Sequence, residues 1–439
     1  MRISTIQAFN SSVSGMQKNY ANVSRTQEQI STGKRILTPA DDPVASVRLL
    51  QLSQEQALNA QYTSNNTAAQ NSLNSEEAIL SSIGTVLQRI REIGVQAGNG
   101  TLDSTDRDSL GTEIQQREDE LLSLMNSKDA SGHYLFGGSQ SDQQPFVRNA
   151  DGTYSYQGDE TERNVQVASS TFIALGDDGK DLFENVFNAN RVTTAHPTVG
   201  TNVDGTVSTG RISLGLVTDK TAYDNTFPSS NPPVATDGIG IHFLSSTSYV
   251  VYDQATLPAG YDWTTYDPTT PPTGQLATGA IDTNTATSDF ISYGGVRVQI
   301  DGVPQNGDDF AINRKPDEEK RSLLNTVSDL RKALQGSGDS AEDNRVIRDS
   351  AAIALSNLDA VYTKVDAVRG SVGARLNTLD STGDFIADVT LVNKSVQSDL
   401  EDLDYADAIS RLSLQSTILS AAQQSYVKIA NLSLFNYIS

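Results

Sequence analysis

The sequence predicts an α+β protein: long coiled-coil helices from both termini, a helical bundle, and an inserted, mainly β outer domain. Three observations support this. Narrow apolar stripes lie near both ends of the 439-residue chain, eleven of the thirteen prolines lie between Pro145 and Pro316, and residues 44–144 and 317–439 contain none. Proline interrupts helix interiors, so long helices fit the flanks and not the middle.

The two terminal stripes have the three- and four-residue spacing of a coiled-coil seam. The N-terminal stripe comprises Phe9, Val13, Met16, Tyr20, Val23 and Ile30. The C-terminal stripe comprises Leu412, Leu419, Ala422, Tyr426, Ile429, Leu432 and Phe435. A lone helix cannot bury such a stripe, and helices in water depend on packing for most of their stability. We therefore expect residues 1–45 and 395–439 to pair, with Tyr20 and Tyr426 in the seam, while the flanking faces contact other subunits.

Charge supports this pairing and restricts the partners. Residues 1–50 carry six Lys/Arg and three Asp/Glu, whereas residues 395–439 carry two and five, so the ends have opposite signs. Screened surface charges contribute only a fraction of a kcal/mol each, and chance variation in short segments explains the difference equally well. The formal net charge of −22 argues against nucleic acid as a partner.

A helix–loop–helix hinge follows the first stripe, in the segment STGKRILTPADDPVAS from Ser31 to Ser46. Glycine can end a helix in the left-handed conformation, and proline with preceding carboxylates is typical of the first turn of the next helix. The residues given these roles are Gly33, Pro39, Asp41, Asp42 and Pro43.

The proline-free flanks predict a bundle made of residues 46–146 and 317–394. Apolar residues recur at helical spacing from Leu80 to Ala97, from Leu110 to Met125, from Leu323 to Leu334 and from Ile347 to Val372. A turn at Gly98–Gly100 should precede a helix capped at Asp103 or Ser104.

The middle of the chain, residues 147–316, predicts the inserted β domain. Three stretches alternate β-branched or aromatic residues with polar ones between turn residues: Gly152–Gly158, Gly238–Asp253 and Gly294–Ile312. Two segments rich in Thr, Pro, Asn and Ser, at Asn225–Pro233 and Asp267–Thr287, should be long surface loops.

The sequence contains few residues that could form a catalytic, cofactor-binding or metal site, and we expect none of these sites. The three histidines, His133, His196 and His242, form no metallopeptidase motif, and neither a nucleophile elbow nor a P-loop occurs. Asp103–Glu113 lacks the acidic spacing of a calcium loop. There is no cysteine, no apolar run long enough for a transmembrane helix, and no apolar core of a cleavable signal peptide at the start.

Several motifs carry a resemblance to a known family. The Ser31–Ser46 segment resembles the N-terminal signature of the bacterial flagellin superfamily, and Arg369–Asp380 (RGSVGARLNTLD) is similar to its last bundle helix. The opening MRIST and the segments Gly132–Phe146, Gly302–Ile312 and Leu403–Ser439 resemble its hook-associated, hook–filament junction branch. The resemblance covers residues 1–146 and about 294–439, and it is weak between them.

This resemblance implies a structural role outside the cell. Such proteins are exported unfolded by the flagellar type III apparatus, without a cleaved signal peptide, and an export chaperone is an implied partner. Their paired terminal helices line the axial channel, and a ring of copies joins hook-associated protein 1 to flagellin. No membrane insertion is implied.

Two other functions remain open from the sequence. One is a flagellin-type filament subunit, although flagellins usually carry SSG-R-I-NSA-DD where this chain reads STGKRILTPADDP. The other is a surface adhesin or glycan-binding module in the β insert. The Pro/Thr-rich loops and Trp263, the only tryptophan, allow it, but it would need clustered aromatic residues that the sequence does not reveal.

Overall fold

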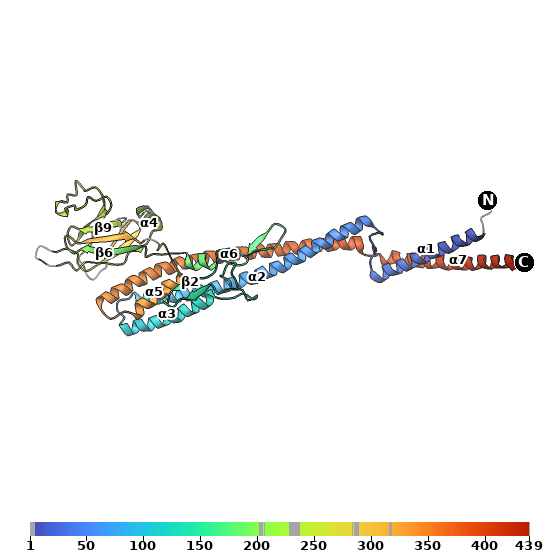
Figure 1. The fold of residues 1–439 in the computed structure, drawn as a ribbon, viewed down its shortest axis with the longest axis horizontal. Coiled ribbons are helices and arrows are strands. Elements are labelled where there is room, and N and C mark those ends of the chain that lie inside the picture. The colour runs from blue at the N-terminus through green and yellow to red at the C-terminus, as the bar shows by residue number, and fades with distance from the viewer. Residues whose placement is uncertain are drawn as a thin grey trace. The chain divides into compact units, whose positions relative to one another are not determined.

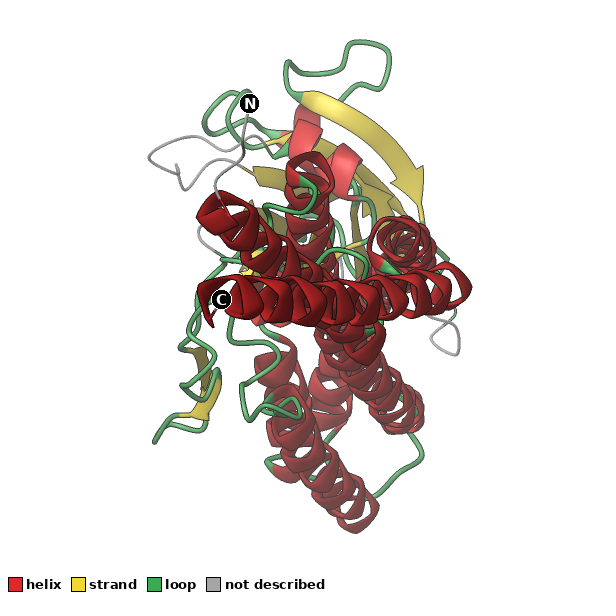
Figure 2. Ribbon diagram, turned by 90° about the vertical axis from the view of Figure 1, so that its right-hand side faces the viewer, coloured by secondary structure: helices red, strands yellow, loops and turns green. Residues whose placement is uncertain are grey.

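The computed structural model describes residues 5–201, 205, 207–227, 238–282, 284, 289–315 and 318–438. The backbone forms two compact units, which are described separately. Unit 1 comprises Met1–Ala68, Gln166–Phe172 and Thr378–Ser439, and unit 2 comprises Ala69–Val165 and Ile173–Asn377. The α+β fold class is confirmed, with helices and strands distinguished by colour in Figure 2.

Long helices occupy both flanks of the chain, as the proline distribution predicts (Figure 1). The helices are α1 Thr5–Thr32, α2 Pro43–Ala97, α3 Ser104–Met125, α4 Lys220–Thr226, α5 Leu323–Gln335, α6 Ala341–Glu401 and α7 Tyr405–Ile438. The expected cap of α3 is present, since the Asp103 side chain accepts a hydrogen bond from the Asp106 N–H at 2.8 Å.

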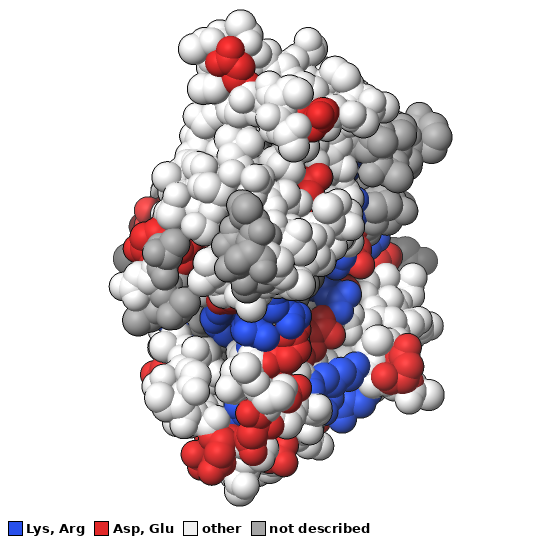
Figure 3. Space-filling view, turned by 90° about the vertical axis from the view of Figure 1, so that its left-hand side faces the viewer, with Lys and Arg blue, Asp and Glu red and all other residues white. Residues whose placement is uncertain are grey.

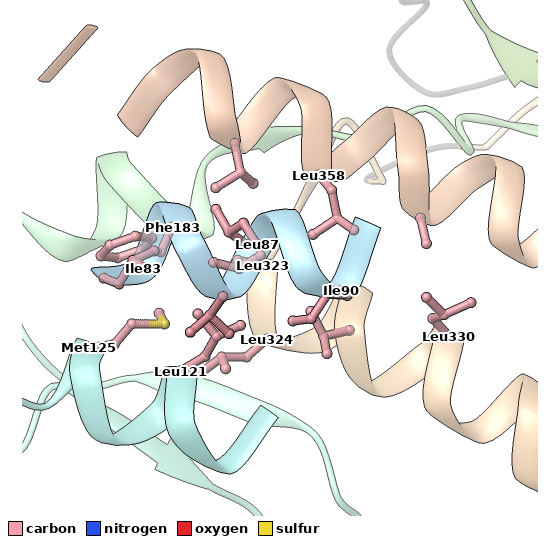
Figure 4. Packing of buried hydrophobic residues seen from close by; sticks show 14 of the residues in the cluster. Ile83, Leu87, Ile90, Leu121, Met125, Phe183, Leu323, Leu324, Leu330 and Leu358 are labelled. Atoms are coloured by element: carbon pink, nitrogen blue, oxygen red, sulfur yellow. The ribbon is translucent and has the colours of Figure 1, made fainter. Parts of the chain in front are cut away.

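The helical core of unit 2 gathers most of the apolar positions that predict the bundle. Figure 4 shows side chains of α2, α3, α5 and α6 converging on one cluster. Its labelled members are Ile83, Leu87, Ile90, Leu121, Met125, Phe183, Leu323, Leu324, Leu330 and Leu358. Each such side chain stabilises the fold by about 1.5–3 kcal/mol when fully buried.

One carboxylate is enclosed within this helical region. Glu118 of α3 is 0% exposed. Its Oε1 accepts hydrogen bonds from Tyr154 Oη at 2.6 Å and Arg148 Nη2 at 3.1 Å, and its Oε2 accepts one from Arg331 Nε at 2.7 Å. Because buried charge is costly without partners, this arrangement holds α3, α5 and the β-hairpin of residues 146–156 together.

A second buried glutamate, Glu76 of α2, anchors the loop that follows strand β4 (Phe172–Ala174). Glu76 is 0% exposed, and its Oε1 accepts a hydrogen bond from the Asp177 N–H at 2.9 Å. Arg375 of α6 forms an ion pair with Asp177. Burial, followed by the charge of Asp177, raises the pKa of Glu76 to about 8.

The middle of the chain is built from short antiparallel strands. They are β1 Phe146–Arg148, β2 Tyr154–Tyr156, β3 Asn164–Gln166, β4 Phe172–Ala174, β5 Val186–Phe187, β6 Val192–Thr198, β7 Arg211–Ile212, β8 Leu216–Val217, β9 Gly238–Phe243, β10 Ser248–Asp253, β11 Gln275–Ala280, β12 Asp289–Tyr293, β13 Val296–Asp301, β14 Asp309–Arg314 and β15 Lys320–Arg321. The three predicted β stretches thus contain β2, the β9–β10 hairpin, and β13 with β14.

Two sheets form a sandwich around their own core. One has the order β11-β10-β9-β14-β6 and the other β12-β13-β7, with β8 also paired to β13. Inward residues such as Ile241, Phe310 and Val298 form a cluster separate from the helical core. Several residues between 146 and 186, among them Phe146 and Phe183, pack instead with the helices. The boundaries expected for the inner domain, the bundle and the β insert remain predictions.

The loop expected at Asp267–Thr287 is only partly a loop. It contains β11, whose residues pair antiparallel with β10, for example Thr278 with Val250. The Thr- and Gly-rich composition conceals a strand that is held by ladder hydrogen bonds more than by its own propensity. Of the other expected loop, Asn225–Pro233, residues 225 and 226 end α4, Phe227 follows, and the rest lies outside the described residues.

The four-stranded sheet rests on α6. The Arg348 guanidinium donates to both carboxylate oxygens of Asp301 at 2.8 and 2.9 Å. The Leu214 N–H donates to Asp349 Oδ2 at 3.1 Å. This sheet therefore meets the bundle with its outer face, which leaves the outer face of the five-stranded sheet as the other broad surface of the sandwich.

Candidate assembly site at the paired terminal helices

Helices α1 and α7 of unit 1 pack side by side (Figure 1). The ring centroids of Phe9 and Tyr426 lie 5.3 Å apart. The Thr26 hydroxyl donates to Gln415 Oε1 at 2.8 Å, and Thr26 is buried. The two ends of the chain therefore meet through both apolar and polar contacts.

The seam between these helices follows a heptad repeat on both sides. Its buried and half-buried positions include Ser12, Met16, Asn19, Val23, Thr26 and Ile30 on α1. On α7 they include Ala408, Leu412, Gln415, Leu419, Ala422 and Tyr426. Polar residues at seam positions specify register at some cost in stability, and the Thr26–Gln415 hydrogen bond has that character.

The structure corrects the predicted face of α1. Tyr20 is 67% exposed and Phe9 is 40% exposed, so Tyr20 is not a core residue of the chain. The seam is turned toward Asn19 and Thr26, because pairing with α7 uses polar positions that an apolar pattern cannot reveal. Val13 is half-buried beside this seam. The side chains of Ile429, Leu432 and Phe435 lie outside the described residues, although α7 continues to Ile438.

The hinge begins where α1 ends. Gly33 has φ +72° and its N–H donates to the Gln29 carbonyl at 2.9 Å, which is a left-handed helix end that glycine adopts without strain. The buried Gln29 side chain donates from Nε2 to the Arg35 carbonyl at 2.6 Å. Pro39 follows in a turn closed by the Asp41 N–H and the Thr38 carbonyl.

The two hinge aspartates have different tasks. Asp42 Oδ1 accepts from the Ala45 N–H at 3.0 Å and so caps α2, whose first residue is Pro43. Asp41 Oδ2 instead accepts from the Leu37 and Thr38 N–H groups, both at 3.0 Å. Asp41 thus shapes the loop while Asp42 starts the helix.

A second break, which the sequence analysis missed, lies opposite the first. Helix α6 ends at Glu401 and α7 begins at Tyr405. The Arg35 N–H donates to the Glu401 carbonyl at 2.7 Å, and the Leu403 N–H donates to the Gly33 carbonyl at 3.0 Å. We name residues 33–42 together with 402–404 the crossover. Its available signal was Asp404, a helix cap whose Oδ1 accepts from the Ala406 N–H at 2.9 Å.

Three arginine–aspartate pairs surround an open cavity of about 430 Å³ beside the crossover. The pairs are Arg25 with Asp41, Arg35 with Asp42 at 3.8 Å, and Arg411 with Asp407 at 2.8 Å. A further ion pair joins Lys34 to Glu401 across the two arms. Exposed pairs of this kind contribute little singly, so the backbone hydrogen bonds carry more of the connection.

The remaining candidate residues form no reactive constellation. His196 Nε2 lies 3.0 Å from Asp308 Oδ1, His242 stacks on Trp263, and His133 is within 3.9 Å of Asp129. Within the described ranges, no three His, Asp or Glu side chains are grouped as metal ligands. No helix in the described part of the chain is long and apolar enough to span a bilayer.

Comparisons with known proteins agree with this architecture. Residues 3–141 match the bacterial flagellin N-terminal helical region, and residues 355–438 match the bacterial flagellin C-terminal helical region. Flagellar hook-associated protein 3 of Salmonella typhimurium is 39% identical over 186 residues, which are 42% of this chain and 58% of that protein. The Escherichia coli protein of that name is 37% identical over the same shares. The match therefore spans less than two thirds of either relative.

A solved structure extends the likeness to most of the fold. The flagellar junction protein FlgL from Legionella pneumophila superposes with a TM-score of 0.57 at 26% identity, covering 81% of this chain and 99% of that one. Flagellins also occur among the relatives, at lower identity. These relatives are structural flagellar proteins. The chain belongs to the bacterial flagellin family.

Proposed function

We propose that this chain is a structural subunit of the bacterial flagellum that joins the hook to the flagellin filament. The observation that carries the proposal is its similarity to hook-associated protein 3, at 39% identity, which exceeds its identity to the flagellins. The role is mechanical, and no catalytic step belongs to it.

The proposed partners follow from this role. Copies of the chain form a ring that contacts hook-associated protein 1 on one side and flagellin on the other, and an export chaperone holds the chain before secretion. The subunit works outside the cell and is exported without a cleaved signal peptide. A chain with no cysteine suits passage from a reducing to an oxidising compartment.

The paired terminal helices are the proposed assembly surface. After α1 and α7 have packed, apolar side chains remain exposed on both helices: Phe9, Tyr20, Ile409, Leu414, Ile418 and Val427. Exposed apolar faces of this extent are typical of interaction surfaces. We infer that neighbouring subunits cover them, that Ile429, Leu432 and Phe435 extend the same surface, and that the crossover fixes the direction of both arms.

The hinge residues and the domain map complete the proposal. Residues 1–45 with 395–439 form the inner assembly domain, residues 46–146 with 317–394 the bundle, and residues 147–316 the outer domain. Gly33, Pro39, Asp41, Asp42 and Pro43 form the hinge between the inner assembly domain and the start of α2. Because both arms are connected at the crossover, a change there should alter assembly without unfolding the bundle.

Deletion of the gene tests the proposal directly. The expected result is a cell with hooks but no filaments, which releases flagellin monomers into the medium. A complementing copy of the gene should restore filaments. If the deletion instead removes the major filament protein itself, while a hook with its associated proteins remains, the chain is a flagellin and the junction role is wrong.

A further inference from the structure

The outer face of the five-stranded sheet is covered in an unusual way. In β9, Ile239, Ile241 and Phe243 point into the sandwich core, so Gly238, Gly240 and His242 lie on the opposite face. A Cβ at Gly240 would lie 2.0 Å from the Tyr252 ring, which therefore rests directly on the glycine. Gly238 and Gly240 have no side chains, so this part of the strand leaves room for aromatic rings from other elements.

Those rings form a cluster that no sequence pattern reveals. Trp263 stacks on His242, with ring centroids 4.2 Å apart and planes 7° apart. Tyr252, Tyr261 and Tyr266 surround Trp263 at centroid distances of 5.3, 5.0 and 6.1 Å. Tyr261, Trp263 and Tyr266 are only half-buried, so the cluster keeps aromatic surface in contact with solvent.

Polar groups without partners lie on the same face. Both ring nitrogens of His242 and Oδ1 of Asn313 are buried with no hydrogen-bond partner among the described residues. Buried polar atoms are normally paired, but unpaired ones also occur elsewhere among the described residues, for example Asn59 Nδ2 and Arg191 Nε, so these three atoms do not by themselves indicate a ligand. Burial lowers the pKa of His242 to about 4, which leaves its ring neutral at pH 7.

A carboxylate borders the aromatic cluster. Asp309, opposite His242 in the register of β14 and β9, accepts from the Tyr252 hydroxyl at 2.8 and 2.9 Å. A carboxylate beside tyrosine and tryptophan offers hydrogen-bond acceptors next to flat apolar rings. That combination suits a ligand that has hydroxyl groups on its rim and C–H groups on its face.

The surrounding surface excludes anionic ligands. Residues 221–296 contain neither Lys nor Arg, while they include seven aspartates. In Figure 3 the Lys and Arg side chains of the visible face gather in its lower half, and the upper part shows white atoms with scattered Asp and Glu. Phosphates, sulfated or sialylated sugars and nucleic acid would be repelled here.

We propose that the outer face of the five-stranded sheet, at Trp263, Tyr261, Tyr266 and Asp309, binds an uncharged, β-linked pyranose oligosaccharide. Equatorial hydroxyl groups leave the flat face of such a sugar apolar, so it can lie on an aromatic ring while its rim donates to Asp309. Rigid Tyr and Trp side chains provide such contact at low entropic cost. The bundle does not compete for this face, because the sandwich meets α6 through its other sheet.

The single tryptophan makes the test specific. The purified full-length chain is titrated with the β-1,4-linked glucose tetramer and the β-1,4-linked N-acetylglucosamine trimer, and Trp263 fluorescence is recorded. A saturable change with at least one of these probes is expected, confirmed by calorimetry. A heparin fragment of similar length is expected to produce none.

Three variants complete the experiment, and their folding is verified by circular dichroism. Calorimetry should show binding at least about tenfold weaker for Trp263→Ala and for Tyr261→Ala. Phe172→Ala, which removes an exposed aromatic ring elsewhere, should bind like the parent chain. Absence of binding to both neutral probes, preference for heparin, or unchanged affinity in folded Trp263→Ala and Tyr261→Ala would each overturn the proposal.

Discussion

Replacement of the buried carboxylate on α3 tests how much its enclosed ion pairs stabilise the fold, because the same helix offers a half-buried glutamate as a matched control. Glu118 is fully buried and bonded to Arg148, Arg331 and Tyr154. Glu113 lies on the same helix and pairs with Arg89 at 2.7 Å, but its side chain is 29% exposed, so the pair is partly open to solvent. The changes Glu118→Gln and Glu113→Gln are chemically identical and remove one negative charge each.

The contacts of the two glutamates determine how much each variant should lower the free energy of unfolding. Loss of one partner of a buried ion pair costs about 3–5 kcal/mol. Arg148 keeps Asp119 at 3.0 Å, and Arg331 keeps Gln335 at 3.0 Å, so Glu118→Gln should lie near the lower limit, at about 3 kcal/mol. Glu113→Gln breaks a pair that is partly open to solvent, and this loss should cost below about 1 kcal/mol.

Urea unfolding of the purified chain, followed by far-ultraviolet circular dichroism at pH 7, measures both variants. The transition midpoint of Glu118→Gln should fall clearly below that of Glu113→Gln, with the same slope for both. Coincident midpoints for the two variants would show that the buried network does not stabilise the fold, and the reasoning from burial would be refuted.

Four further predictions concern the crossover, the arms and pH. Gly33→Ala should destabilise the crossover by about 1–2 kcal/mol, because Gly33 has a φ of +72° that alanine adopts only with strain. As a control, Gly15→Ala in the interior of α1 should stabilise that helix by about 0.5–1 kcal/mol. Swimming-halo assays should show a defect in Gly33→Ala alone. Val23→Asp should cost several kcal/mol of packing in the seam and abolish filament assembly, and normal filaments would contradict the paired termini. The terminal arms should be disordered in dilute monomer and fold on assembly, so that limited proteolysis removes them; protease-resistant arms would contradict this. The pKa of Glu76 is raised from 4.5 to about 8, so between these pH values the folded state keeps a proton that the unfolded chain loses. The free energy of unfolding should therefore fall as pH rises from about 4.5 to 8. Urea titrations at several pH values should show a shallower pH dependence of this free energy for Glu76→Gln, and an equal dependence in both chains would exclude Glu76 as the cause.

The sequence predicts the helical flanks well because their signals are local. Proline placement, helical apolar spacing and the cap at Asp103 each depend on neighbours within a few turns. The start of α2 at Pro43, after Asp42, is predictable for the same reason. Such features need no knowledge of which segments meet in space.

The face of α1 was not predictable in this way, whereas the second helix break had a local signal in the cap residue Asp404. Thr26 and Gln29 are buried because Gln415 and the Arg35 carbonyl supply their hydrogen bonds. The first contact depends on the pairing with α7 and the second on the folded crossover. Tyr20, apolar and correctly spaced, is exposed because these polar residues occupy the seam instead. An apolar pattern therefore identifies a coiled coil but not its rotation.

The aromatic cluster of the insert was even less predictable from the sequence. His242 and Tyr252 are brought together by the register of β9 and β10, while Trp263 arrives from the loop that follows. Each ring is ordinary by itself, and only the sheet register places them on one face beside Asp309. Sites of this kind depend on long-range pairing, which composition and spacing do not encode visibly.

The crossover explains how two marginal helices can hold one defined register. Heptad seams that consist partly of Ser, Asn, Thr and Gln bury little apolar surface. If α1 slid along α7 by one heptad, much of that apolar contact would still be made. A slide is opposed at the crossover, where the Gly33 carbonyl and the Arg35 N–H are bonded to Leu403 and Glu401. Backbone hydrogen bonds at one end thus fix the alignment of the entire α1–α7 pair, and the Thr26–Gln415 bond repeats the same alignment along the seam. The side-chain contacts along the seam therefore need to contribute little to the alignment. This suits two helices that must pair in one register and still leave apolar faces for other subunits.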